Sequence, residues 1–215
     1  MQWSEGGGVP PMHSRDDFPP SDVKSVRAFI AVRMNLKSED AISGAIDELR
    51  SASGDAVRWV KPANLHVTLK FLGAAVEPRR LEPLAEALHD VAIATGEFDA
   101  IARGIGAFPS LDRPNVVWVG IRGVESGTLA ALAARVDNGA ALCGFEREQK
   151  RWNGHLTIGR VRNHRPGDAF REAARAMAER EFGISRIESL TLYRSHLSDE
   201  GSRYEPLSTF LLKRN

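Results

Sequence analysis

The chain has 215 residues, of which 42% are hydrophobic and 27% are charged, so it can build a core without disulfides or a metal. Lysine plus arginine (29) nearly balances aspartate plus glutamate (28), which excludes a polycation that coats nucleic acid and leaves only local patches for such contacts. The single cysteine excludes an internal disulfide and a multi-cysteine zinc site, and no apolar run reaches the ~18 residues of a membrane span.

Residues 1–23 are rich in glycine, proline, serine and aspartate, and they lack a periodic apolar pattern. This composition predicts a flexible N-terminal extension, followed by one domain over residues 24–215. The first residues also lack the basic stretch and apolar run of a secretory signal, which favours a cytoplasmic setting.

Apolar residues alternate with period two in several segments and recur at helical spacing in others. Residues 26–35 alternate as a strand, and Ile42, Ile46 and Leu49 then predict a helix with Ser38 as its N-cap. The other predicted strands are 58–60, 65–72 (ended by Gly73), 98–107, 116–121, 152–161, 187–197 and 207–212. The other predicted helices are one that begins at Pro78 and two over residues 128–142 and 168–182. Strands outnumber helices and most connections suit antiparallel pairing, which predicts an α+β fold.

A short pattern occurs twice in the chain. His66-Val-Thr-Leu69 and His155-Leu-Thr-Ile158 both read His-apolar-Thr-apolar, and both lie on predicted strands. Because side chains alternate between the two faces of a strand, the histidine and the threonine of each copy share one face. A duplicated unit can close around a pseudo-two-fold axis, which would bring the two pairs together across a cleft.

Two imidazoles and two hydroxyls are the groups that an in-line displacement at phosphorus needs when no metal takes part. One neutral histidine accepts a proton from the attacking oxygen, and one protonated histidine donates a proton to the leaving oxygen. Each such transfer contributes about 10²–10⁴-fold, and it requires ring nitrogens roughly 5–8 Å apart. The hydroxyls of Thr68 and Thr157 can bind the non-bridging oxygens.

The two motifs and their flanks resemble the twin signature of the 2H phosphoesterase superfamily, and within it the bacterial and archaeal RNA 2′,3′-cyclic phosphodiesterases, also called 2′-5′ RNA ligases. The resemblance extends from about Val26 to Leu212. The segments that carry it are Phe29-Ile-Ala31, His66-Val-Thr-Leu-Lys-Phe-Leu-Gly73, Val117-Trp-Val-Gly120, His155-Leu-Thr-Ile-Gly-Arg160, Leu192-Tyr-Arg-Ser195 and Tyr204-Glu-Pro-Leu207.

This resemblance implies a bilobal fold, in which two pseudo-symmetric halves with antiparallel sheets flank a central cleft and helices lie outside. It also implies hydrolysis of an RNA 2′,3′-cyclic phosphate to a 2′-phosphate without a metal, with the reverse 2′-5′ ligation possible. His66 would be the general acid that protonates the departing 3′ oxygen, and His155 the general base that activates water, although the near symmetry of the site permits the reverse assignment. Arg160 matches the family's arginine after the second motif and would bind the phosphate.

Several residues near the motifs have both a functional and a structural interpretation. Gly154 stands where the family usually has proline, which predicts a more flexible start to the second strand. Arg160 lies opposite His155 by simple alternation, so it reaches the cleft only if Gly159 bends the strand. Lys70 shares the face of His66 and could meet an RNA backbone or only solvent, whereas Phe71 shares the core face and is expected to pack there.

Other features carry less information. Between Arg147 and Arg165 there are six basic residues and one acid, Glu148, a bias that fits either a rim that guides RNA or a solvated surface. Tyr193 and Ser195 could border the cleft or only pack between strands. The six basic residues are Arg147, Lys150, Arg151, Arg160, Arg162 and Arg165. The residues expected to have only a structural role or to lie on the surface are His13, His89, His164, His196 and Cys143.

Alternatives remain within and outside this chemistry. The substrate could instead be a 2′-5′-linked oligonucleotide or a small cyclic nucleotide, and the chain could be a non-catalytic protein that binds RNA ends. A metal held by His66 and His155 is disfavoured because neither motif contains a carboxylate. We therefore predict a cytoplasmic, monomeric enzyme that acts on RNA without a cofactor, a membrane or an obligate protein partner.

Overall fold

The structure, a computed structural model, describes residues 18–19, 22–162, 166–198 and 201–214. Most of the predicted extension lies outside these residues, but Phe18 and Val23 are partly buried against the hydrophobic core. The helices and strands are β1 (Val26–Val32), α1 (Leu36–Ser53), β2 (Val57–Trp59), β3 (Val67–Val76), α2 (Leu81–Ile93), β4 (Phe98–Phe108), β5 (Val116–Gly123), α3 (Thr128–Leu142), β6 (His155–Val161), α4 (Asp168–Ala176), β7 (Glu181–Ile187), β8 (Ser189–Ser198) and β9 (Gly201–Leu211).

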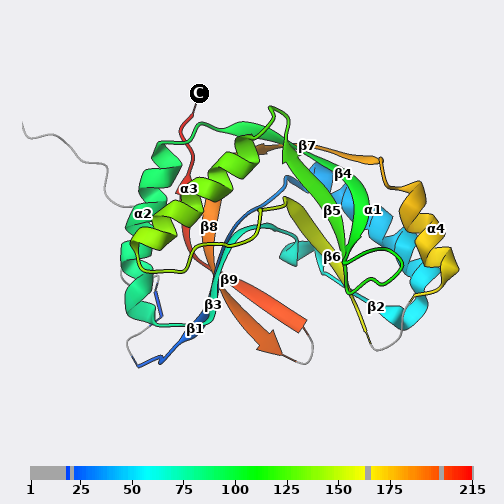
Figure 1. Cartoon of the computed structure of the whole chain (residues 1–215), viewed down its shortest axis with the longest axis horizontal. Helices are drawn as coiled ribbons and strands as arrows, with labels where there is room; N and C mark the ends of the chain where they lie inside the picture. Colours follow the sequence, from blue (N-terminus) through cyan, green and yellow to red (C-terminus); the bar gives the residue numbers. More distant parts are fainter. Residues whose placement is uncertain (1–17, 20–21, 163–165, 199–200, 215) are drawn as a thin grey trace, which may run out of the picture.

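The strands form one antiparallel sheet whose order is symmetric about its centre. The order is β7-β4-β5-β6-β3-β1-β8-β9, and β2 also pairs with β6, through Val57 with Val161 to Trp59 with Gly159. At the centre, β3 and β6 are joined through one residue pair, Val67 with Leu156. On each side of this junction lies a group of strands with two helices (Figure 1). In the first lobe, α2 and α3 pack beside β1, β3, β8 and β9. In the second lobe, α1 and α4 pack beside β2 and β4 to β7. The predicted α+β fold with two pseudo-symmetric halves is confirmed.

The two lobes do not coincide with the two halves of the sequence. The first lobe combines β1 and β3 with the C-terminal hairpin β8–β9, and α1 crosses to the second lobe to pack against α4 and β7. Each lobe buries the apolar face of its strands against its helices, as shown by the fully buried Leu84 and Leu88 of α2 and Ile42 and Leu49 of α1.

Two local predictions were wrong. The N-cap of α1 is Asn35, whose side-chain oxygen accepts a hydrogen bond from the backbone N–H of Ser38, so Ser38 lies inside the helix rather than before it. The predicted helix over 168–182 ends at Ala176, and residues 181–187 instead form the edge strand β7. Only Phe182, Ser185 and Ile187 of this strand are buried, so its pairing with β4 determines its conformation more than its own apolar pattern does.

A β-bulge in β3 changes which side chains face the core. Ile30 of β1 pairs with Lys70 and Ala31 pairs with Thr68, so Leu69 is an extra residue between them. An extra residue reverses the alternation beyond it. Lys70, expected beside His66, is therefore buried, and Phe71, expected in the core, is 45% exposed with the guanidinium of Arg27 over its ring at 4.4 Å.

The buried Lys70 joins the sheet to α3. Its Nζ donates hydrogen bonds to Asp137 Oδ1 (2.5 Å) and to the carbonyl oxygen of Glu146 (2.7 Å). The Lys70 ammonium lowers the pKa of the Asp137 carboxyl, against the opposing effect of burial, so this carboxylate is held ionised. Lys70 therefore has a structural role, and contact with an RNA backbone is not available to it.

Replacing Lys70 with alanine should destabilise the fold by about 3 kcal/mol, because it removes the buried cation that is hydrogen-bonded to Asp137. The mostly buried carboxylate then keeps only the backbone N–H of Glu148 and the more distant guanidinium of Arg147, at 3.9 Å. Urea unfolding followed by circular dichroism measures this loss. The control is Lys37→Ala, at an exposed lysine, which should change the free energy of unfolding by less than about 0.5 kcal/mol. Equal effects of the two substitutions would contradict the structural role of Lys70.

Candidate active site

The two His-x-Thr motifs lie side by side at the junction of the lobes. Val67 of β3 pairs with Leu156 of β6, so the antiparallel register sets His66 opposite Thr157 and Thr68 opposite His155. Leu65, Val67, Leu156 and Ile158 are buried, whereas the two histidines and the two threonines between them are partly exposed. The predicted alternation is thus confirmed. The two histidines are diagonal neighbours, a relation that typically separates Cα atoms by about 7–8 Å.

Both imidazoles are held by the same backbone contact. His66 Nδ1 lies 2.7 Å from the carbonyl oxygen of Asn64, and His155 Nδ1 lies 2.8 Å from that of Asn153. A carbonyl can only accept, so each Nδ1 carries a hydrogen, and each Nε2 remains to accept or donate a proton. The repeated unit is therefore Asn-x-His-x-Thr, longer than the motif found from the sequence, and the matching asparagines at 64 and 153 are the signal that was missed.

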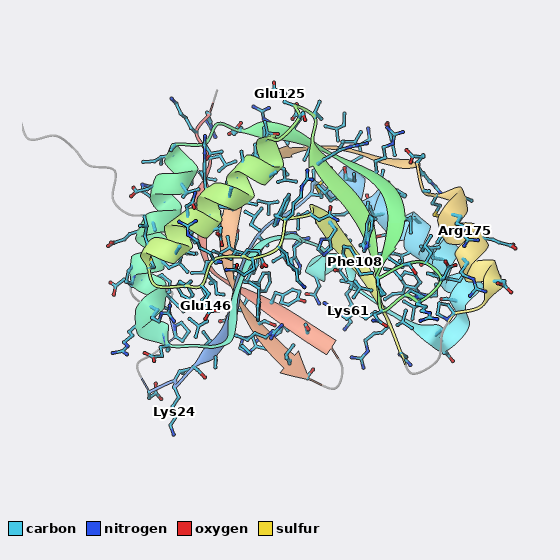
Figure 2. The ribbon with its side chains drawn as sticks, in the orientation of Figure 1. Lys24, Lys61, Phe108, Glu125, Glu146 and Arg175 are labelled. Atoms are coloured by element: carbon cyan, nitrogen blue, oxygen red, sulfur yellow. The ribbon has the colours of Figure 1, made fainter. Side chains whose placement is uncertain are left out.

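Aromatic rings pack against both imidazoles. The ring of Tyr204, from β9, meets His66 edge-on at 4.9 Å, and Phe29 lies 4.8 Å from His66 and 5.0 Å from Tyr204, so the three rings form one cluster. Phe108, at the end of β4, meets His155 edge-on at 5.0 Å. In Figure 2, Phe108 lies in the central region between the two helix pairs. These contacts limit ring rotation, so the Nε2 atoms keep a defined direction.

The electrostatic surroundings of His66 favour its neutral form. The pKa of His66 is lowered to about 4, mainly by burial. The nearby cations Arg33 and Arg160, together with His155, contribute to this lowering against the raising effect of the Asn64 carbonyl. Arg33 was not identified from the sequence. Its guanidinium lies in the pocket that also contains His66, held by Glu39 (2.8 Å) and by the carbonyl oxygen of Ala63 (3.2 Å).

This pKa predicts that the protein loses stability in acid. An unfolded histidine titrates near 6.5, so between pH 6.5 and 4 the unfolded chain binds a proton at residue 66 that the folded chain does not. The free energy of unfolding should therefore fall as the pH drops through this window, by up to about 3 kcal/mol, with the remaining solvent contact of the ring reducing the value.

Thermal unfolding of the wild type and of His66→Gln across this pH range measures the effect. The variant should lose distinctly less stability between pH 6.5 and 4 than the wild type. The control is His89→Gln on helix α2, which should follow the wild-type curve. Parallel curves for all three proteins would contradict the assignment of the effect to His66.

Arg160 reaches the site face because β6 contains the same bulge as β3. Val117 of β5 pairs with Gly159 and Trp118 pairs with Thr157, so Ile158 is an extra residue. Beyond it the alternation reverses, and Arg160 lies on the face of His155 and Thr157, where it lowers the pKa of His66. Gly159 has a second reason to be glycine, since a Cβ there would lie 2.6 Å from Val57.

Gly154, the departure from the family pattern, is closely packed. A Cβ at this position would lie 2.2 Å from the carbonyl oxygen of Ile121 and 2.9 Å from the ring of Trp152, so neither proline nor alanine fits. The carbonyl of Gly154 accepts a hydrogen bond from the N–H of Ile121 at 2.9 Å, and the indole N–H of Trp152 donates to the carbonyl of Thr68. These contacts hold the start of β6 in place, in contrast to the flexibility predicted from the sequence.

The remaining candidates separate into two groups. Tyr193 lines the pocket beside His66, whereas Ser195 is buried between strands. His196 lies on the β8–β9 hairpin with its Nε2 2.6 Å from Glu205, and Cys143 is partly buried after α3. Among the basic residues, Arg147 contacts Asp137 and Asn138, Arg151 lines a pocket beside α3, and Arg160 lies on the face of the site. His13, His164 and Arg165 lie outside the described residues.

Metal-binding clusters and membrane-spanning helices are both absent from the described residues. No group of three or more histidine, cysteine or acidic side chains is placed to hold a metal ion there. Among the helices of this part of the chain, none is both long and apolar enough to cross a bilayer.

Comparison with known proteins shows which family this chain is similar to. The model of the 2′-5′ RNA ligase superfamily matches residues 38–199. The chain is 34% identical over 185 residues to an RNA 2′,3′-cyclic phosphodiesterase of Archaeoglobus fulgidus, with 86% of this chain and 99% of that protein covered. An RNA 2′,3′-cyclic phosphodiesterase of Methanothermobacter thermautotrophicus is 34% identical over 187 residues, with 87% and 99% covered.

Solved structures share the fold. The crystal structure of TT0787 from Thermus thermophilus superposes with a TM-score of 0.73 at 26% identity and covers 88% of this chain and 99% of its own. E. coli LigT in its apo form superposes with a TM-score of 0.64 at 23% identity, over 88% of this chain and 99% of its own, which shows the fold alone.

Proposed function

Because this chain belongs to the 2′-5′ RNA ligase superfamily, as the match over residues 38–199 and the archaeal relatives show, we propose that it hydrolyses RNA 2′,3′-cyclic phosphate ends with His66 and His155 as its proton-transfer pair. The family resemblance predicted from the sequence is confirmed by these matches. The observation that carries the proposal is the pairing of the two motifs across β3 and β6, with both Nδ1 atoms bound to carbonyls and both Nε2 atoms left for chemistry.

The reaction is an in-line displacement at phosphorus. Nε2 of His155 accepts a proton from a water molecule, whose oxygen forms the new bond to phosphorus. The bond from phosphorus to the 3′ oxygen breaks, and Nε2–H of His66 donates its proton to that oxygen. The products are a 2′-phosphate and a 3′-hydroxyl. A 5′-hydroxyl that attacks in place of water gives a 2′-5′ linkage by the same steps, and the reverse of those steps cleaves that linkage and restores the cyclic phosphate.

Four further side chains can stabilise the phosphate. The hydroxyls of Thr68 and Thr157 share the face of the histidines and can donate hydrogen bonds to the non-bridging oxygens. Arg160, brought to this face by the bulge at Ile158, supplies positive charge as the phosphorane forms. Arg33 adds a second cation beside His66.

The low pKa of His66 fits the role of acid once substrate is bound. In the free enzyme His66 is neutral at pH 7, because burial disfavours its charged form. A cyclic phosphate carries one negative charge, and an anion beside an imidazole raises the pKa of that imidazole. Substrate binding and protonation of His66 therefore favour each other.

The direct test is incubation of the purified protein with an RNA that ends in a 2′,3′-cyclic phosphate, in the presence of EDTA. Conversion to a 2′-phosphate end is the expected result. Binding of the RNA without conversion would instead indicate a non-catalytic protein that holds RNA ends. Activity lost in EDTA and restored by a divalent cation would contradict the metal-free mechanism. We propose further that the enzyme is a monomer in the cytoplasm and needs no cofactor or obligate protein partner.

A further inference from the structure

A groove of about 480 Å³ lies between the β8–β9 hairpin and the strands β2 and β6. Its lining comes from segments that are distant in the sequence: β2 and the residues after it, the end of β6, and both strands of the hairpin. Figure 1 shows the hairpin extending from the first lobe toward β2 and β6 of the second. Of the basic residues grouped above as a possible rim, Arg160 lines this groove, whereas Arg58, Lys61 and Arg203 were not indicated by the sequence.

The groove is basic. Arg58, Lys61, Arg160 and Arg203 line it, and none of its described lining residues is acidic. Glu205, which approaches from the hairpin, accepts a hydrogen bond from the lining residue His196 at 2.6 Å, and Arg194 lies 4.0 Å from the same carboxylate. Its negative charge is therefore offset locally, and the four cations determine the potential in the groove.

The groove continues to the active site on the side of His66. Ala63, Asn64 and Tyr204 line both the groove and the small pocket that contains His66. Asn64 is the residue whose carbonyl holds the His66 ring, and Tyr204 packs edge-on against that ring. Arg160 belongs to the groove and also acts electrostatically on His66.

We infer that this groove binds the RNA strand whose 3′ end carries the cyclic phosphate, so that the enzyme's substrate class is single-stranded oligoribonucleotides and not cyclic mononucleotides. The inference rests on the proposed function, in which His66 protonates the 3′ oxygen. That oxygen stays attached to the RNA, so the strand leaves the phosphorus on the side of His66, and this is the side where the groove begins.

The chemistry of the lining fits a single strand. Lysine and arginine side chains neutralise successive phosphates without reading sequence, and the aromatic rings of Trp59 and Tyr204 in the same walls can stack on bases of any identity. Residues on the β8–β9 hairpin line this groove. The hairpin therefore takes part in binding the RNA and also forms one edge of the sheet.

The experiment compares kcat/KM for a cyclic-phosphate tetraribonucleotide with kcat/KM for the corresponding cyclic mononucleotide. For the wild type we expect a ratio of about ten or more. The double variant Lys61→Ala/Arg203→Ala, at two exposed positions, should lower this ratio about tenfold. It should also make the slope of log(kcat/KM) for the tetranucleotide against log[salt] shallower by about 1.4, since two phosphate contacts are lost.

The matched control removes the same two charges elsewhere. Arg79 and Arg175 are exposed and paired with Glu77 and Asp112, and Figure 2 shows Arg175 on the outer helix α4. Arg79→Ala/Arg175→Ala should keep the wild-type ratio and salt slope.

A wild-type ratio near one, or equal ratios in the groove variant and the control, would overturn the inference. Failure of the proposed function is distinct, since the wild type would then convert neither substrate. In that case salt-dependent binding of the labelled tetranucleotide, weakened only in the groove variant, would still support the groove.

Discussion

Replacing His155 with alanine is expected to lower kcat/KM for a cyclic-phosphate RNA by about 10²–10⁴-fold, because the attacking water then loses its proton acceptor. The fold should persist, since His155 is partly exposed and its ring lies against Phe108 and the carbonyl of Asn153 at the edge of the site. Time courses of 2′-phosphate formation measure the loss of kcat/KM, and thermal unfolding checks that the variant is folded. Undiminished turnover by a folded variant would contradict the mechanism.

The same variant should not respond to a better leaving group. Replacing the bridging 3′ oxygen of the cyclic phosphate with sulfur makes the leaving group a thiolate, which departs without a proton because thiols are far stronger acids than alcohols. Activation of water is still required with this substrate. His155→Ala should therefore lose activity by a similar factor on the oxygen and the sulfur substrates.

Replacing His66 with alanine is expected to give the opposite pattern. On the natural oxygen substrate the loss should again be about 10²–10⁴-fold, because the departing 3′ alkoxide is no longer protonated. On the 3′-sulfur substrate the loss should shrink to about tenfold or less, which reflects only the binding and alignment that His66 provides. The comparison of the two substrates separates the roles of the histidines, which their matching Nδ1–carbonyl contacts do not distinguish.

A reversal of the pattern, with the sulfur substrate restoring His155→Ala and not His66→Ala, would show that the acid and the base are exchanged. Loss on both substrates by both variants would contradict an acid role for either residue. The pH profile is a weaker discriminator. Its acidic limb in kcat/KM should lie near pH 4, the pKa of His66, whichever of the two roles that residue has.

The arginine at position 160 illustrates how a local pattern and a tertiary contact combine. Alternation along the strand set Arg160 opposite His155, and the suggestion that Gly159 bends the strand allowed it to reach the cleft. In the structure, Arg160 lies on the face of the site because Ile158 is an extra residue in the pairing of β6 with β5. The equivalent bulge in β3 had the reverse consequence for Lys70, which it moved from the site face to a buried ion pair with Asp137.

The sequence by itself determined the fold class, most strands and helices, and the pairing of each histidine with a threonine on one face. These follow from period-two and period-3.6 patterns, which are local properties of the chain. Only the tertiary structure decided which strands adjoin, where the two bulges lie, that burial lowers the pKa of His66, and that Arg58, Lys61, Arg160 and Arg203 share one groove. Strand register, burial and electrostatic proximity depend on residues far apart in the chain, so no short segment encodes them.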